Sequence, residues 1–229
     1  MTTIEPTPEG LWYRPAARPA GAAFLLLHEA PGVTDNIRRR CARLAALGHI
    51  AFAPHLHGTD RYLAGPEAQA AVAAWQADPL AMRRRVGDCV DILVRGSGLP
   101  PGRVIILGYC FGGLAAIEFA RGGGAVAAIA SFHGLLQTIR PAEAGAMRTP
   151  LLVCTGGRDP LVPPAEVGRF HAEMAAAQAD WRMIVYGDAY HSFTNEDAAS
   201  FGNPGMRYHP LADGHAWDEA MALAAQSLR

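Results

Sequence analysis

A cysteine stands between closely spaced glycines in the stretch GYCFGG, residues 108–113. The apolar run RVIIL precedes this stretch and LAAIEFA follows it, which predicts a strand, a sharp turn and a helix. This is the context of a nucleophile elbow with sulfur in place of the serine oxygen. Gly108 and Gly112 avoid collisions with neighbouring backbone, and the helix N-terminus favours a thiolate. The pattern therefore favours Cys110 as a nucleophile over Cys110 as a small core residue.

A thiol nucleophile needs a base, and the base needs an acid that orients it. Asp159 follows the predicted strand PLLVC, and His191 follows the predicted strand WRMIVYG. Their order after Cys110 is the order found with nucleophile elbows of this kind. Asp188, close to His191 in sequence, stays an alternative acid, and His133, at another strand end, is an alternative base or a pocket residue. Ligands bind beyond the carboxyl ends of such strands, so we expect the nucleophile, acid and base to meet in one crevice.

The remaining cysteines are far apart, and none has the C-x-x-C spacing of a zinc ribbon or redox pair. We expect Cys41, Cys89 and Cys154 to be free thiols that behave as small buried hydrophobic residues. The proposed chemistry needs no metal or organic cofactor, and we expect none.

Apolar runs bounded by Gly or Pro alternate along the chain with segments of helical periodicity. The predicted strands span residues 21–28, 49–54, 103–109, 124–134, 149–157 and 181–188, and the clearest predicted helices span 34–48, 79–95 and 211–229. The stretch 55–69 is irregular and long, and such loops are often functional. Near-continuous apolar strands indicate a sheet covered on both faces. We therefore expect one α/β domain over residues 1–229, with a mostly parallel central sheet flanked by helices.

Charged residues at the predicted helices have simple local interpretations. The arginine run at positions 38, 39, 40 and 43 lies mostly off the apolar face, which indicates a solvated surface. Thr34 or Asp35 can cap the start of this helix, and Asp213 is a possible cap of the last helix.

Composition excludes several kinds of partner. Half of the 229 residues are hydrophobic, the formal net charge is −1, and no basic run with interleaved aromatics is present, so we expect no nucleic acid partner. The N-terminus has no signal-peptide pattern, and the apolar runs are far shorter than the ~20 residues of a membrane helix. We expect a cytoplasmic protein without membrane contact, either a monomer or a homodimer.

Four motifs together resemble the dienelactone hydrolase family, a cysteine branch of the α/β-hydrolases: GYCFGG, GGRDPLVP, HSFTN and HEAPGV. The resemblance implies an α/β-hydrolase fold, with Cys110 as nucleophile, Asp159 as acid and His191 as base. It implies a carboxylic ester or lactone hydrolase that cleaves a small substrate through a thioester. The alternative is a non-catalytic relative that binds a small ligand.

The motif HEAPGV places Glu29 directly after an apolar strand, where an unpaired buried carboxylate is costly. The resemblance implies that Glu29 holds the resting thiol and changes partner when substrate arrives. It also implies that the backbone N–H groups of Ala30 and Phe111 form the oxyanion hole.

One departure from the family concerns the substrate. Members that open dienelactones grip the substrate carboxylate with two arginines, one of them in H-S-F-x-R, where this chain has Asn195. Arg61 is a candidate for the second arginine, and Arg207 is a further candidate charge near the site. Arg61, His133 and Asn195 are therefore the expected substrate-binding residues, while the missing clamp weakens the case for a carboxylate-bearing substrate.

Overall fold

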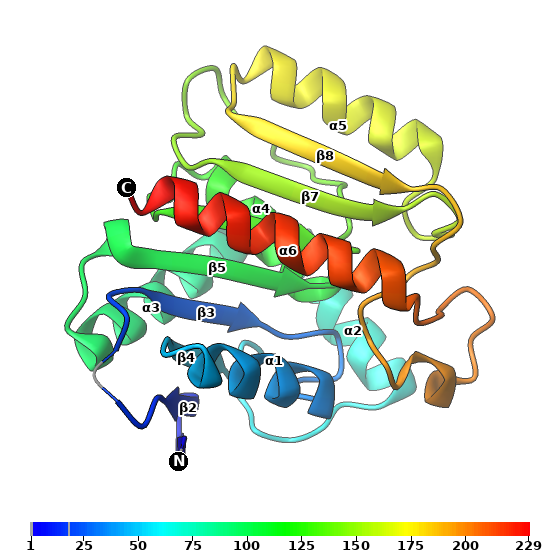
Figure 1. Cartoon of the computed structure of the whole chain (residues 1–229). Coiled ribbons are helices and arrows are strands. Elements are labelled where there is room, and N and C mark those ends of the chain that lie inside the picture. The colour runs from blue at the N-terminus through cyan, green and yellow to red at the C-terminus, as the bar shows by residue number, and fades with distance from the viewer. Residues whose placement is uncertain (1, 18) are drawn as a thin grey trace.

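The computed structural model describes residues 2–17 and 19–229, which form a single eight-stranded sheet in the order β1-β2-β4-β3-β5-β6-β7-β8 (Figure 1). The strands are β1 (Thr3–Thr7), β2 (Gly10–Arg14), β3 (Ala23–Leu27), β4 (Ile50–Pro54), β5 (Val104–Tyr109), β6 (Ala128–Phe132), β7 (Leu151–Gly156) and β8 (Trp181–Tyr186). The strands from β3 to β8 pair in parallel, whereas β1–β2 and β2–β4 are antiparallel. The prediction of an α/β fold with a mostly parallel sheet is confirmed.

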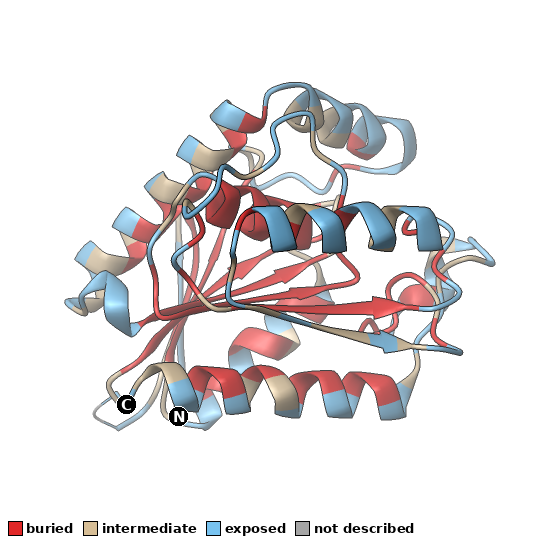
Figure 2. Cartoon of the chain, turned by 90° about the horizontal axis from the view of Figure 1, so that it is seen from above, coloured by how far each residue is buried: buried red, intermediate tan, exposed pale blue. Residues whose placement is uncertain are grey.

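Helices cover both faces of the sheet. They are α1 (Asp35–Ala46), α2 (Gly65–Ala77), α3 (Pro79–Ser97), α4 (Phe111–Arg121), α5 (Pro164–Ala176) and α6 (Pro210–Ser227), with short 3-10 turns η1 (Pro101–Arg103) and η2 (Ala198–Phe201). One core cluster joins α1 and α6 to the sheet, and a second joins α3, α4 and α5 to the opposite face. The central strands are buried between helices whose outer sides are exposed (Figure 2). All parallel strands point their carboxyl ends to one edge, where the candidate site lies.

The antiparallel hairpin of β1 and β2 was not predicted. Its outer strand has the sequence TIEPT, and four of these five residues are exposed. A short polar strand that contains proline is typical of a sheet edge, and it carries no apolar run that would reveal it.

The interpretation of the arginine run is wrong for Arg40. Arg40 is only 6% exposed, and its guanidinium lies 2.7 Å from the buried carboxylate of Asp213 on α6. Asp213 therefore does not cap α6; the imidazole of His209 accepts a hydrogen bond from the Ala212 N–H instead. A charged side chain can lie on the buried side of an amphipathic helix when another element supplies an oppositely charged group to pair with it. The helical periodicity of one segment does not reveal that group.

Three further predictions can be compared with the structure. Cys41, Cys89 and Cys154 are buried free thiols, as expected, and Cys110 is half-buried. The stretch predicted as irregular over 55–69 is irregular only as far as residue 64, because α2 begins at Gly65. Among residues 2–17 and 19–229, no helix combines the length and the hydropathy that a membrane span requires.

Candidate active site

Cys110 occupies the turn between β5 and α4, in a backbone conformation that non-glycine residues rarely adopt. Its φ is 53° and its ψ is −113°. The turn is held from both sides: the Cys110 N–H donates to the Phe132 carbonyl at 3.0 Å, and the Gly112 N–H donates to the His28 carbonyl at 2.9 Å. Backbone strain of this kind persists only where the surrounding structure enforces it. The neighbouring strands β3 and β6 supply that enforcement.

The glycines of the elbow are required by close backbone contacts. A Cβ atom on Gly108 would lie 2.2 Å from the Gly112 carbonyl oxygen. A Cβ atom on Gly112 would lie 2.1 Å from the Leu27 carbonyl oxygen. Any larger side chain would push α4 away from β3 and β5, so the predicted reason for these glycines is confirmed.

The structure brings Cys110, His191 and Asp159 into one hydrogen-bonded chain. His191 Nε2 lies 3.1 Å from Cys110 Sγ, and His191 Nδ1 lies 2.8 Å from Asp159 Oδ2. The second carboxylate oxygen of Asp159 accepts the Leu161 N–H at 2.8 Å, which fixes the carboxylate. Asp188, the alternative acid, is exposed and contacts His209 instead.

The surroundings of His191 favour its protonated form. Burial alone would lower the pKa of His191, but the Cys110 sulfur and the Asp159 carboxylate outweigh burial and raise that pKa above its usual value. The imidazole is fully buried and contacts the sulfur through Nε2. The arrangement can therefore take a proton from the thiol and hold it as an imidazolium beside a thiolate.

The loop after His191 folds back sharply and is joined by the segment near Met206. Ser192 has a φ of 57°, and the His191 N–H donates to the Gly205 carbonyl at 3.1 Å. Behind His191 lies His133, whose ring packs edge-on at 5.3 Å between centroids and whose Nε2 is 2.8 Å from the Thr194 hydroxyl. His133 is completely buried, so it supports the His191 loop and does not line the pocket.

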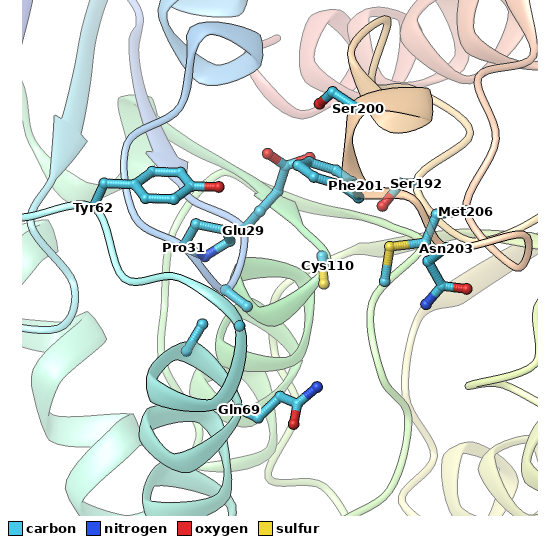
Figure 3. Close-up of a pocket in the computed structure, with 13 residues that line it drawn as sticks. Glu29, Pro31, Tyr62, Gln69, Cys110, Ser192, Ser200, Phe201, Asn203 and Met206 are labelled. Atoms are coloured by element: carbon cyan, nitrogen blue, oxygen red, sulfur yellow. The ribbon is translucent and has the colours of Figure 1, made fainter.

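Glu29 lines the same pocket as Cys110, with its carboxylate directed away from the sulfur (Figure 3). It accepts hydrogen bonds from Thr34 Oγ1 at 2.8 Å, Asn195 Nδ2 at 2.9 Å and Asn36 Nδ2 at 3.2 Å. Burial raises the pKa of Glu29, and these three donors partly oppose the shift. Within the described ranges Glu29 makes no hydrogen bond to Cys110, so the structure shows the sulfur with His191 and not with the carboxylate.

The backbone N–H groups of Ala30 and Phe111 flank Cys110. Ala30 lines the same pocket as the sulfur, and Phe111 is the first residue of α4, directly after the nucleophile. In residues 2–17 and 19–229 neither N–H donates to another protein group. Two backbone donors without a protein acceptor are what an oxyanion hole needs.

The pocket in front of Cys110 has a volume of about 350 Å³ (Figure 3). It is lined by Glu29, Ala30, Pro31, Tyr62, Gly65, Ala68, Gln69, Cys110, Ser192, Ser200, Phe201, Asn203 and Met206. Figure 3 shows Gln69 below Cys110 in this view, and Asn203 and Met206 to its right. The walls therefore come from the loops after β3, β4 and β8, from α2, from η2 and from the segment that follows η2.

The expected substrate-binding residues lie outside this lining. Arg61 is exposed and pairs with Glu67 at 2.5 Å, and Asn195 is buried as a donor to Glu29. Arg207 is also exposed and stacks on the ring of Tyr190. Of the lining residues, the sequence analysis named Glu29, Ala30 and Cys110. It singled out the irregular stretch that contains Tyr62, but it did not identify the wall residues on α2, on η2 and after η2. Among the residues that the structure describes, no cluster of three or more His, Cys, Asp or Glu is arranged to hold a metal ion.

A mostly parallel sheet with a strained nucleophile elbow at the end of β5 defines an α/β-hydrolase fold. Residues 9–228 match the model of the dienelactone hydrolase family, and the chain belongs to that family.

Individual relatives support this assignment. A solved structure named "m3DLH" is 32% identical, with a TM-score of 0.89 over 96% of this chain and 92% of its own. A dienelactone hydrolase-like promiscuous phosphotriesterase from metagenomic libraries is 29% identical, with a TM-score of 0.87 over 99% and 97% of the two chains. A Salmonella typhimurium protein named "Putative carboxymethylenebutenolidase" is 28% identical over 214 residues, which are 88% of this chain and 76% of that protein.

Proposed function

We propose that this protein hydrolyses small lactones or activated esters through a Cys110–His191–Asp159 triad and a thioester intermediate. The observation that carries the proposal is the continuous contact from Cys110 Sγ through the His191 ring to the Asp159 carboxylate. A half-buried sulfur that opens into a pocket can reach a substrate carbonyl, whereas a core cysteine cannot.

In the first half of the proposed reaction, His191 Nε2 takes the thiol proton and the sulfur attacks the substrate carbonyl carbon. The carbonyl oxygen becomes an oxyanion that the N–H groups of Ala30 and Phe111 stabilise. The intermediate collapses, the bond to the leaving oxygen breaks, and His191 returns the proton to that oxygen. An acyl thioester on Cys110 and an alcohol or enol are the products of this half.

In the second half, a water molecule replaces the leaving group. His191 takes a proton from the water, the resulting hydroxide attacks the thioester carbonyl, and the sulfur leaves and regains the proton. The product is a carboxylic acid, and the enzyme returns to its initial state. Asp159 holds the His191 tautomer and stabilises the imidazolium in both halves.

The sulfur nucleophile restricts the leaving group. A thiolate is a better leaving group than an alkoxide, so a tetrahedral intermediate from an alkyl ester returns to substrate. An enolate or phenolate competes with the sulfur, and acylation then proceeds. We expect para-nitrophenyl esters and enol lactones to be hydrolysed much faster than ethyl esters or amides, and equal rates on para-nitrophenyl and ethyl esters with acylation limiting would contradict the proposal.

The pocket favours an uncharged acyl group. Among the described residues that line it, none is Arg or Lys, and the only carboxylate is that of Glu29. A substrate carboxylate would lose its hydration there without gaining a cation. We expect kcat/KM for para-nitrophenyl valerate to exceed that for mono-para-nitrophenyl glutarate, which differs by one terminal carboxylate, by at least about tenfold.

The direct test replaces the nucleophile. Cys110→Ala is expected to lower turnover by at least about 10³-fold while the circular dichroism spectrum and thermal midpoint stay close to those of the wild type. Intact-mass measurement after rapid quenching should show one acyl group on the wild type and none on the variant. A ligand-binding protein without catalysis would instead bind the ester, form no acyl adduct and show no turnover in either form.

A further inference from the structure

The peptide group between Glu29 and Ala30 is held by its carbonyl. His28 Nδ1 lies 2.7 Å from the Glu29 carbonyl oxygen, and the Gly32 N–H donates to the same oxygen at 3.1 Å. In a planar trans peptide the N–H points opposite to the carbonyl. A hydrogen bond that fixes the Glu29 carbonyl therefore also fixes the direction of the Ala30 N–H.

The next carbonyl along the chain is held by a second histidine. His57 Nε2 lies 2.9 Å from the Ala30 carbonyl oxygen, and the Trp75 indole N–H donates to His57 Nδ1 at 3.3 Å. The His57 ring also stacks on the ring of Phe111, with 4.9 Å between centroids and 7° between planes. One side chain thus contacts both residues that supply the oxyanion donors.

The partners of the two imidazoles determine where their protons lie. A carbonyl only accepts, so His28 Nδ1 and His57 Nε2 each carry a hydrogen. The Leu56 N–H and the Trp75 N–H donate to the opposite ring nitrogens, which must be unprotonated. Burial lowers the pKa of His28 to about 3 and also lowers that of His57, which agrees with two neutral rings of opposite tautomer.

We infer that His28 and His57 are positioning residues of the oxyanion hole, and that Trp75 fixes His57. This inference rests on the proposed function. An oxyanion hole accelerates a reaction only when its donors are already in place as charge develops. The loop that carries Ala30 contains Gly32, with a φ of 113°, so without external bonds its peptide groups have freedom to rotate.

The test separates acyl transfer from the reactivity of the sulfur. Iodoacetamide alkylates Cys110 by displacement of iodide, which creates no oxyanion, whereas hydrolysis of para-nitrophenyl acetate does create one. His57→Phe keeps an aromatic ring against Phe111 and removes both ring nitrogens. We expect kcat to fall about 10- to 100-fold with little change in KM, while the rate of alkylation of Cys110 stays within about twofold of the wild type.

A conservative variant tests the hydrogen bond itself. His57→Gln places an amide N–H near the position of Nε2, and we expect it to recover much of the kcat that His57→Phe loses. Trp75→Phe removes only the donor to His57 and should give a smaller loss of kcat. His171→Phe makes the same substitution on the exposed side of α5 and should leave kcat unchanged.

Each outcome has one meaning. A folded His57→Phe variant with wild-type kcat would overturn the positioning role, and so would a His57→Gln variant as slow as His57→Phe. Alkylation that falls in parallel with hydrolysis would mean that the substitution disturbs Cys110 and His191, which also overturns it. Hydrolysis that persists in Cys110→Ala would overturn the proposed function itself, whatever the His57 variants show.

Discussion

The two sides of Cys110 are built in different ways. On one side, the loops after β7 and β8 present Asp159 and His191, which reach the sulfur with their own side chains. On the other side, the loop after β3 presents a backbone N–H, and the side chains there hold the backbone in place. We call these the acid–base side and the oxyanion side.

The difference shows what a residue type can reveal. A histidine that moves a proton must be a histidine, so its identity is informative. A backbone N–H belongs to every residue except proline, and many kinds of side chain can support it. The supporting residues also come from distant elements, as Trp75 on α2 does. The residues proposed for the acid–base side could therefore be chosen from sequence by their types. On the oxyanion side the family resemblance implied the two N–H donors, but the side chains that support them required the structure.

The largest expected effect lies on the acid–base side. His191→Gln removes the base, and we expect kcat to fall by at least about 10³-fold. Because the Cys110 sulfur and the Asp159 carboxylate raise the pKa of His191, we expect His191 to promote alkylation of Cys110 in the wild type at neutral pH. In the variant, alkylation should slow at neutral pH and recover only in alkaline solution. If Cys110 in His191→Gln is still alkylated rapidly at neutral pH, the two variants would not differ in the reactivity of the sulfur, and the proposed difference between the two sides would be wrong.

Asp159→Asn tests the second member of the acid–base side. It removes a charge that raises the pKa of His191, so that pKa should fall and the imidazolium should be lost at lower pH than in the wild type. We expect kcat to drop about 10²- to 10³-fold, less than for His191→Gln. The pH profile of Cys110 alkylation measures the shift, and an unchanged profile would show that the carboxylate does not act through the imidazole.

Glu29 lies between the two sides. Comparing its replacement by Ala with its replacement by Gln distinguishes the effect of losing the hydrogen-bond acceptor from the effect of losing the carboxylate charge. Glu29→Ala leaves two buried amides and the half-buried Thr34 hydroxyl without their partner, and we expect a loss of about 1–3 kcal/mol in the free energy of unfolding. Glu29→Gln keeps an acceptor oxygen and should cost less. Urea denaturation measures both, and equal losses would contradict the importance of these hydrogen bonds.

The same carboxylate predicts a pH dependence of stability. Because burial raises the pKa of Glu29 in the folded state, its contribution is fully present below the unfolded carboxyl pKa of about 4.3. The contribution is lost as the pH rises through the raised value. Relative to Glu29→Gln, the wild type should therefore lose stability over that interval, and urea titrations at a series of pH values check the direction.

The smallest effect concerns substrate charge. Gln69→Arg places a cation on α2 at the pocket wall, and we expect a few-fold rise in kcat/KM for mono-para-nitrophenyl glutarate with little change for the valerate ester. Gln137→Arg adds the same charge at an exposed position outside the pocket lining and serves as the control. An equal rise for both esters would show an effect unrelated to charge.

The six parallel strands, β3 to β8, and their ends could be located from sequence, because buried parallel strands are short apolar runs with clear boundaries. Cys110, Asp159 and His191 could be placed at one edge for that reason. The direction of Asn195 could not be inferred, since the left-handed backbone of Ser192 turns the chain between His191 and Asn195. Asn195 accordingly donates to Glu29 instead of facing the pocket.

The pocket wall was harder to predict than the triad. Gln69 and Met206 are ordinary residue types that line the cavity only because α2 and the segment after η2 fold over the elbow. Thr34 was predicted as a possible helix cap and stands at the N-cap position of α1, but its side chain accepts no capping hydrogen bond. Its hydroxyl instead donates to Glu29.

The buried pair of Arg40 and Asp213 has a consequence for the order in which the site matures. Arg40 also donates to the carbonyl of Thr194, so one guanidinium joins α1, α6 and the loop that begins at His191. During synthesis the ribosome would release the elbow long before the eighteen residues of α6 emerge. In a nascent chain Cys110 would thus leave the ribosome while the loop that begins at His191 still lacks its bond to Arg40. Packing of α6 against α1 would then complete the site.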